Sequence, residues 1–272
     1  MFSANHFIWL GLCAVFVAVM LFASVKYKFS FKTATTIICC IIGASEVAKI
    51  MYSMQPAVGS GMVISGGALP FHLCSILIFM FAYLMFGKNE KIKNVLKSFV
   101  VPAGILGGLL AILIPTSGVS FTKIESYQCF IYHAAILWYA AYLIATKQAN
   151  LGLKAYLRNL AILAVLAVFN IWVNGALQAY NTNFMFLVRP PVEGLPIINL
   201  NNGWYAYFFT LITIAVVLIG IVQLPSIIKE LQQKRNAKKS GFKPEPNQTF
   251  EVVEDNTTKL ENKNVGKTDD IQ

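Results

Sequence analysis

Residues 7 to 25 read FIWLGLCAVFVAVMLFASV, and this stretch holds no charged side chain. A helix needs about 20 mainly apolar residues to cross the hydrocarbon core of a bilayer, so the stretch is long enough to span it. No lysine or arginine precedes it, unlike the charged start of a cleaved signal peptide. We therefore expect a retained transmembrane helix here.

Six further stretches have the same apolar character. They lie at about residues 33–53, 69–87, 96–116, 127–146, 159–179 and 204–224. The whole chain is 57% hydrophobic and only 12% charged, whereas a soluble domain carries roughly 25% charged residues. The sequence therefore predicts an all-α polytopic membrane protein with seven transmembrane helices.

The predicted loops are alternately rich and poor in lysine and arginine along the chain. The rich loops hold Lys26, Lys28 and Lys32, then Lys88, Lys91, Lys93 and Lys97, then Lys147, Lys154 and Arg158. The opposite loops hold only Lys123 and Arg189. Because cytoplasmic loops carry the excess of basic residues, we expect the N-terminus outside, the C-terminus in the cytoplasm and a multi-pass protein of the cell membrane. This topological role also explains the net charge of +10 without nucleic acid as a partner.

The composition changes at Pro225. Residues 1–225 are the predicted seven-helix transmembrane domain and contain four of the twelve acidic side chains. The other eight lie in residues 226–272. The second region starts as a basic juxtamembrane segment, which either contacts anionic lipid headgroups or only fixes topology. Its remainder is too polar to bury a core, so we expect a disordered cytoplasmic tail.

Strongly polar side chains are costly inside a membrane, so each is a candidate for function. The predicted orientation places them all in the outer half of the bundle. Candidate substrate-binding residues among them are Glu46, Lys49, Ser75, Tyr132, Asn170 and Asn174. Glu46 and Lys49 lie one helical turn apart and can pair. Such an ion pair can stabilise the helix bundle as readily as it can contact a substrate. Buried asparagines often do no more than hydrogen-bond one helix to another.

Cys74 and His133 lie at similar depths below the outer ends of their helices. At about 1.5 Å per residue, the depths are roughly 6 and 9 Å, near the level of phospholipid ester bonds. A thiol near a helix N-terminus beside an imidazole is a plausible nucleophile. His72 lies about 200° around a helix from Cys74, so it is better placed as an orienting or oxyanion group.

Other interpretations of these residues stay open at this stage. Cys74 alone is equally typical of a small buried apolar side chain, and two histidines can simply join helices. No metal site is expected, because the five cysteines and three histidines show no ligand spacing. No cofactor is expected either. Gly104 and Gly108 have the G-x-x-x-G spacing of close helix packing, and the glycine-rich residues 58–67 suggest a flexible outer loop or a re-entrant piece.

Several short motifs carry a resemblance to a known family. They are LPFHLCS at 69–75, Asn5-His6-Phe7, Glu46-x-x-Lys49, Ile114-Pro115-Thr116, Tyr132-His133, Asn183-x-Met185-Phe186-Leu187 before Arg189-Pro190, and Gly203-Trp204-x-x-Tyr207. In this order they resemble the YwaF-type integral membrane proteins, bacterial relatives of transmembrane protein 164. The likeness covers the membrane part and ends at about Pro225.

The resemblance implies a cysteine-dependent lipid acyltransferase, with Cys74 and His133 matching the cysteine and histidine of the family motifs. It also brings Asn183 and Arg189 into the candidate substrate-binding set. The function expected is therefore a Cys/His acyltransferase or acyl hydrolase acting on phospholipid at the outer leaflet, with membrane lipids as partners. The alternative is a small-solute transporter or ligand-binding receptor that uses the same polar cluster. A third is a structural partner acting through its loops and tail.

Overall fold

The computed structural model describes residues 2–56, 59, 61–192 and 194–239. The chain divides into two compact units, Met1–Glu230 and Leu231–Gln272. The described residues form seven α-helices: α1 (Ala4–Lys26), α2 (Phe31–Ser53), α3 (Leu73–Phe86), α4 (Glu90–Leu113), α5 (Ile124–Ala145), α6 (Leu153–Ala176) and α7 (Gly203–Lys239). The expected disordered tail lies almost entirely outside the described residues.

Side-chain caps fix where three of the helices begin. Ser3 and Ser30 precede α1 and α2, and their hydroxyls accept from the backbone N–H groups of His6 and Thr33. Asn89 does the same for the first turn of α4. The first N–H groups of a helix have no partner inside it, so each cap satisfies part of that need.

Six of the helices in the described part of the chain are long and apolar enough to cross a membrane. The protein is thus a multi-pass, essentially helical membrane protein. The exception is α3, a helix of 14 residues where we expected a span over 69–87. At about 1.5 Å per residue it rises roughly 21 Å, less than the hydrocarbon thickness of about 30 Å. Seven helices are present among the described residues, six of them long enough to span and one short and apolar, so the expected count of seven spans stays a prediction.

Pro70 keeps the residue before it out of the helix, and α3 starts later still. A residue before proline is pushed out of the helical region, and Leu69 is extended, with ψ of 147°. His72 is extended too, with ψ of 149°, and α3 begins only at Leu73. The irregular backbone ahead of α3 lies against protein, since Ala68 is buried. This is the condition under which such backbone is tolerated at membrane depth.

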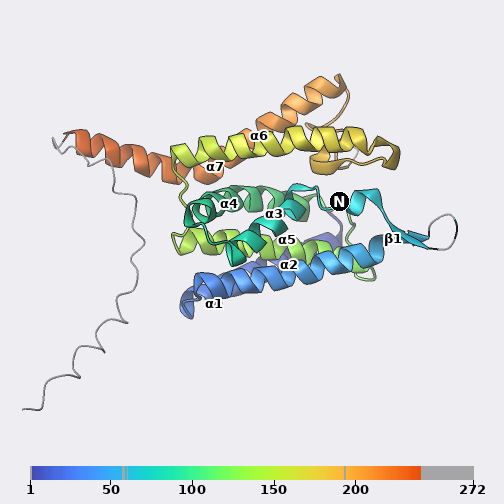
Figure 1. Ribbon diagram of the computed structural model, residues 1–272, viewed down its shortest axis with the longest axis horizontal. Helices are drawn as coiled ribbons and strands as arrows, with labels where there is room; N and C mark the ends of the chain where they lie inside the picture. Colours follow the sequence, from blue (N-terminus) through green and yellow to red (C-terminus); the bar gives the residue numbers. More distant parts are fainter. Residues whose placement is uncertain (1, 57–58, 60, 193, 240–272) are drawn as a thin grey trace, which may run out of the picture. The chain divides into compact units, whose positions relative to one another are not determined.

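A short β-hairpin follows α2. Strands β1 (Met54–Pro56) and β2 (Met62–Ile64) pair antiparallel, with Gln55 opposite Val63. The hairpin extends beyond the end of α2 (Figure 1). Apart from this hairpin the described fold is helical, as expected, and residues 62–64 of the segment expected as a flexible outer loop or a re-entrant piece form its second strand. A 3-10 turn, Gly66–Ala68, then leads towards α3.

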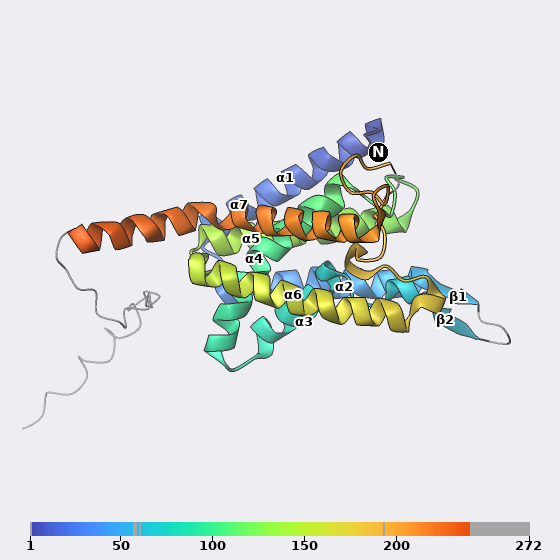
Figure 2. The same cartoon turned by 90° about the horizontal axis from the view of Figure 1, so that it is seen from above.

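The core lies around α5, which runs between α1, α2 and α4 (Figures 1 and 2). Its aromatic residues Trp138, Tyr139 and Tyr142 are fully buried. Each polar tip reaches a neighbouring element: Trp138 donates to Ser24 at 3.0 Å, Tyr142 to the carbonyl of Phe29 at 3.0 Å, and the Tyr139 and Thr35 hydroxyls lie 2.8 Å apart. Buried tyrosine and tryptophan usually find such partners, which here fix the helix register.

Helices α6 and α7 are joined to each other and to α4 by buried amides. Asn159 of α6 donates to the Ser98 carbonyl of α4 at 2.9 Å and to Gln223 of α7 at 3.2 Å. Glu230 accepts from the backbone N–H of Leu153 at 3.0 Å and so ties α7 to the start of α6. The domain boundary expected at Pro225 stays a prediction, but α7 passes through Pro225 without ending.

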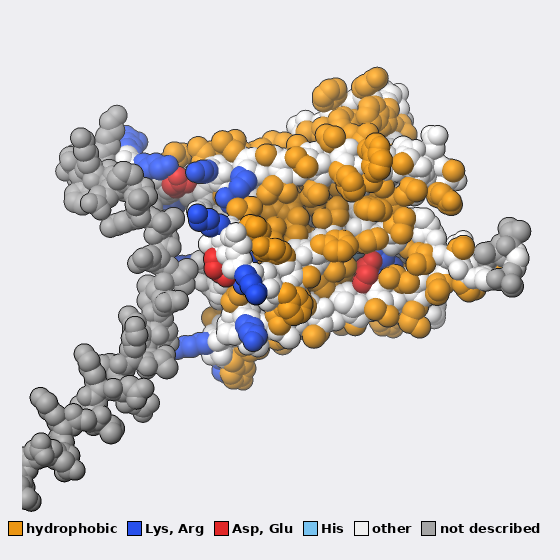
Figure 3. Space-filling view, in the orientation of Figure 1, with side chains coloured by type: hydrophobic (Ala, Val, Ile, Leu, Met, Phe, Trp, Pro, Cys, Tyr) orange, Lys and Arg blue, Asp and Glu red, His pale blue; other side chains and the backbone are white. Residues whose placement is uncertain are grey.

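The surface of the first unit agrees with a lipid environment. Apolar side chains cover most of its helical body, and Lys and Arg side chains gather at one end (Figure 3). Exposed apolar residues such as Phe22, Phe79, Val165 and Trp172 occur on several helices. A soluble protein would bury such side chains or pair them at an interface.

Replacing Thr35 with valine tests the packing around α5. The change leaves the buried Tyr139 hydroxyl without its partner on α2, which we expect to lower the free energy of unfolding by about 1–3 kcal/mol. Thermal unfolding in detergent measures it. Thr213→Val is the matched control, because Thr213 is exposed and bonds only within α7. A double variant with Tyr139→Phe should recover part of the loss, and an equal effect of both threonine variants would contradict the packing.

Cysteine labelling tests the predicted orientation. Asn89→Cys, between α3 and α4, should react with a membrane-impermeant maleimide only after the cell is opened, because its loop carries basic residues. Thr122→Cys, on the opposite side of α4, should react in intact cells. The parent protein, with its five native cysteines, gives the background. Labelling of Asn89→Cys in intact cells would reverse the orientation.

Candidate functional site

The first turn of α3 carries the candidate thiol. Cys74 and Ser75 are the second and third residues of the helix, and His72 is its N-cap residue. The expected separation of about 200° between His72 and Cys74 on one helix is corrected, because His72 lies outside α3 in extended backbone. The N–H groups of a helix's first turn have no partner within the helix, so Cys74 lies where the helix dipole favours negative charge.

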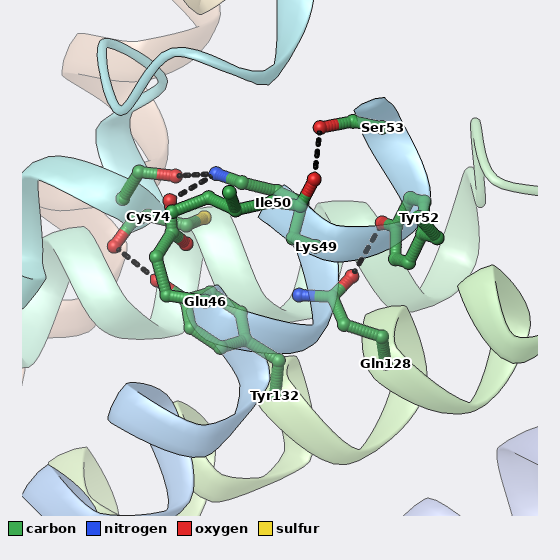
Figure 4. Close-up of polar contacts among 9 residues, drawn as sticks. Glu46, Lys49, Ile50, Tyr52, Ser53, Cys74, Gln128 and Tyr132 are labelled. Carbon is green, nitrogen blue, oxygen red and sulfur yellow. Dashed lines mark hydrogen bonds and ion pairs between the residues drawn. The ribbon is translucent and has the colours of Figure 1, made fainter. Parts of the chain in front are cut away.

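Lys49 of α2 joins this turn to an acidic side chain. Its ammonium lies 2.5 Å from a carboxylate oxygen of Glu46 and donates to the Ser75 hydroxyl at 3.2 Å (Figure 4). The Lys49 and Glu46 side chains are only 16% and 15% exposed. Lys49 therefore connects α2 to the start of α3 by a hydrogen bond, and it also forms the ion pair expected from its spacing.

The charge of Lys49 also reaches the other candidate groups. It interacts electrostatically with the Cys74 thiol and with the imidazoles of His72 and His133. His72 and His133 interact with each other as well. The thiol and both imidazoles are therefore within electrostatic range of one ammonium group, and among the described residues no hydrogen bond joins the Cys74 thiol to either ring.

Tyr132 fixes the backbone of the thiol-bearing turn. Its hydroxyl donates to the carbonyl of Cys74 at 2.8 Å (Figure 4). The side chain is 2% exposed, so this bond is shielded from competing partners. Tyr52 of α2 donates nearby to Gln128 of α5 at 3.2 Å. Polar contacts therefore hold together the end of α2, the start of α3 and the start of α5.

The contacts of His133 fix its tautomer. Its Nδ1 lies 2.7 Å from the carbonyl oxygen of Cys129, four residues earlier in α5, and 3.6 Å from the Cys129 sulfur. A carbonyl oxygen only accepts, so Nδ1 carries the proton. In the neutral ring Nε2 then keeps its lone pair. Nε2 makes no hydrogen bond among the described residues, so it is left to accept a proton.

The candidate asparagines shape the segment between α6 and α7. The predicted orientation places this segment outside the membrane, and we call it the outer segment. Asn174 accepts from the N–H of Phe184 at 2.8 Å and donates to its carbonyl at 3.1 Å. Asn183 accepts from the N–H of Arg189 at 3.2 Å and donates to its carbonyl at 2.8 Å. Asn170 donates to the Met185 sulfur at 3.2 Å.

Arg189 binds within the same outer segment, donating to the side chain and the carbonyl of Asn181 at 2.8 and 2.9 Å. The segment packs on His72, whose ring lies 5.4 Å from that of Phe184 and 5.3 Å from that of Phe186, centre to centre. The structure thus brings Glu46, Lys49, His72, Cys74, Ser75, Tyr132 and His133 to one place. Asn170, Asn174, Asn183 and Arg189 build the segment beside it, and their predicted substrate contacts stay predictions.

The sequence analysis missed two residues that touch the site. Cys129 lies one helical turn before His133, so i, i+4 spacing was a signal that went unused. Phe184 is fully buried and its ring meets the imidazole of His72, but only the tertiary structure brings them together. Among the described residues no group of three or more His, Cys, Asp or Glu side chains has a metal-binding arrangement.

A comparison with protein families identifies the chain. The profile of the TMEM164 family matches residues 1–223, most of the chain. The chain belongs to the TMEM164 family. Neither the curated proteins nor the solved structures include a significant match.

The matched region of this TMEM164-family protein contains the whole candidate site. It runs from the start of α1 into α7 and ends just before Pro225. The expected resemblance is therefore confirmed at the level of a TMEM164-related membrane family. The basic segment and the tail after residue 223 lie outside the match.

Removing the Lys49 charge tests the polar cluster of this TMEM164-family protein. Lys49→Met leaves the shielded Glu46 carboxylate uncompensated, so we expect a loss of about 3 kcal/mol in the free energy of unfolding. The control is Lys93→Met, which breaks the pair with Glu90 at the same i, i+3 spacing where Glu90 is 69% exposed. That loss should stay below about 1 kcal/mol.

Thermal unfolding of both lysine variants in one detergent gives the comparison. Adding Glu46→Gln to Lys49→Met should recover much of the stability, because the uncompensated charge is then removed. Equal losses for Lys49→Met and Lys93→Met would show that the cluster is not shielded as the structure has it.

Proposed function

We propose that this TMEM164-family protein is a Cys/His acyl-transfer enzyme that acts on phospholipid in the outer leaflet. The observation that carries the proposal is the tautomer of His133. Its Nδ1–H is held by the Cys129 carbonyl, which leaves Nε2 as a base in the cluster that contains the Cys74 thiol. A nucleophile activated by an adjacent base that a third group orients is the general pattern of covalent catalysis.

Two balanced steps follow from these groups. In the first, Nε2 of His133 takes the thiol proton, and the Cys74 sulfur attacks the acyl carbonyl of a phospholipid. The ester bond breaks, His133 returns the proton to the leaving alkoxide, and an acyl thioester remains on Cys74. In the second, His133 deprotonates the hydroxyl of an acceptor lipid or water, whose oxygen attacks the thioester carbonyl. The C–S bond breaks, the acyl group leaves on the acceptor oxygen, and His133 returns the proton to the Cys74 sulfur.

The negative oxygen that forms in each step has donors at hand. The first-turn N–H groups of α3 lack partners within the helix, and backbone N–H groups are common oxyanion donors. His72 stands at the same helix end, with its ring positioned by Phe184 and Phe186. We assign it the orienting or oxyanion role, and assign Lys49 the electrostatic support of the charge that develops beside Ser75.

The level of the site favours a lipid substrate. The thiol lies in the first turn of a helix whose start faces outward in the predicted orientation, near the depth of ester bonds. Cys74 itself is half-buried, and its surroundings are apolar apart from the cluster. A lipid in the outer leaflet reaches this level laterally, without leaving the membrane. The proposal includes the cell membrane as location, and anionic headgroups as partners of the basic segment after Pro225.

Trapping the acyl intermediate tests this function. The purified protein in vesicles, given a phospholipid with an alkyne-tagged acyl chain, should form a hydroxylamine-sensitive adduct on the peptide that contains Cys74. Cys74→Ala should abolish the adduct and the turnover. His133→Ala should lower turnover by about 10²–10⁴-fold, because it removes the general base.

Cys40→Ala is the matched control for the loss of a thiol. Cys40 lies on α2 and is exposed on the helix surface, so this variant should keep both adduct and turnover. Lipid turnover that survives both Cys74→Ala and His133→Ala would eliminate the proposed chemistry.

A further inference from the structure

Three glycines lie on one stretch of α4, at positions 104, 107 and 108. A Cβ atom at Gly107 or Gly108 would come closer than 3.0 Å to an atom of a neighbouring helix, and one at Gly104 would lie 3.0 Å from Cγ2 of Ile136. A Cβ atom at Gly107 would lie 2.8 Å from the sulfur of Cys74. A Cβ atom at Gly108 would lie 2.9 Å from Cγ of Leu137 and 3.1 Å from the carbonyl oxygen of His133.

The two contacts concern the two groups of the proposed dyad. The Cys74 sulfur lies directly against the backbone of α4 at Gly107, in the place that a side chain would fill. The backbone of α5 at His133 approaches the same turn of α4 at Gly108, which likewise has no side chain. Glycine is a poor helix former, so adjacent glycines inside a helix weaken it unless the close approach compensates.

We propose that Gly107 is a positioning residue for the Cys74 thiol, and that Gly108 positions the α5 backbone at His133. This inference rests on the proposed function and deepens it. One turn of α4 then serves as the common surface against which the nucleophile and the base-bearing helix pack. The G-x-x-x-G spacing explains Gly104 and Gly108 as helix packing, whereas Gly107 falls outside that spacing and meets a side chain of α3.

The placement has a consequence for the substrate. Because the α4 backbone covers one side of the sulfur, the acyl carbonyl must approach from the side away from Gly107. A methyl group at position 107 pushes the thiol towards that side. A displacement of about 1 Å in a reacting group can cost about a hundredfold in rate. The acyl-transfer rate should therefore depend on residue 107, although this residue offers no functional group.

A double-mutant cycle in thermal stability tests the contact without using activity. Gly107→Ala should lower the melting temperature of the full-length protein when residue 74 is cysteine. In a Cys74→Ala background the clash with the sulfur is absent, so the same change should be neutral or stabilising. Gly11→Ala and Gly175→Ala are matched controls, because a Cβ atom at either glycine meets nothing within 4 Å.

If Gly107→Ala does not fold alone, recovery of folding by Cys74→Ala is the expected result. An equal loss of stability in both backgrounds would overturn the proposed contact. So would a Gly107→Ala variant with wild-type stability and wild-type alkylation of Cys74.

Reactivity of the thiol gives the second readout. The rate at which iodoacetamide alkylates Cys74, followed by mass spectrometry of its peptide, should change severalfold in Gly107→Ala and stay unchanged in Gly11→Ala. Phospholipid turnover should fall by about a hundredfold in Gly107→Ala. If the protein has no acyl-transfer activity, the stability cycle and the alkylation rate still decide the positioning role, so the two failures are distinguishable.

Discussion

The hydrocarbon core of a bilayer offers no hydrogen-bond partner, so polar groups in it must be satisfied by the protein itself. In this protein that constraint is met largely by α5. Tyr139 and Tyr142 meet α2 and the α1–α2 connection towards one end of the helix, and Tyr132 binds the carbonyl of Cys74 towards the other end. The same helix that carries the core aromatics thus also holds the candidate thiol in place.

The candidate site arises from interruptions in an otherwise regular helical bundle. The extended backbone at Leu69 and His72 delays α3, so that Cys74 lies in its first turn. The glycines of α4 let that turn and α5 come close, and the outer segment at Phe184 packs over His72. Each interruption weakens regular secondary structure locally, and each is compensated by contacts that converge on the same polar cluster. Such local departures from the pattern are where function is expected.

Much of the framework was predictable from sequence, because runs of about 20 apolar residues and the bias of basic loops are local signals. The α-helices observed overlap the expected spans, but α7 continues to Lys239, beyond the expected end at 224, and α3 is shorter than expected. The shortness of that helix depends on the backbone from Leu69 to His72, which a count of apolar residues does not register. The β-hairpin was not predicted, because strands of three residues each are too short to give a recognisable sequence pattern. The role of Cys129 as the hydrogen-bond partner of His133 follows from spacing alone and was open to prediction.

By itself the sequence determined that the chain is a multi-pass membrane protein and that Glu46 and Lys49 are spaced to pair, and it predicted that the candidate site residues share one half of the bundle. These follow from the solvent and from spacing along single helices. Only the tertiary structure decided which polar residues meet. It joined Lys49 to Ser75, Tyr132 to Cys74 and the Cys74 sulfur to Gly107. It also showed that Asn170, Asn174, Asn183 and Arg189 hydrogen-bond to residues of the segment between α6 and α7. Contacts between helices depend on the rotation and depth of each helix, and these are set by packing against several neighbours at once.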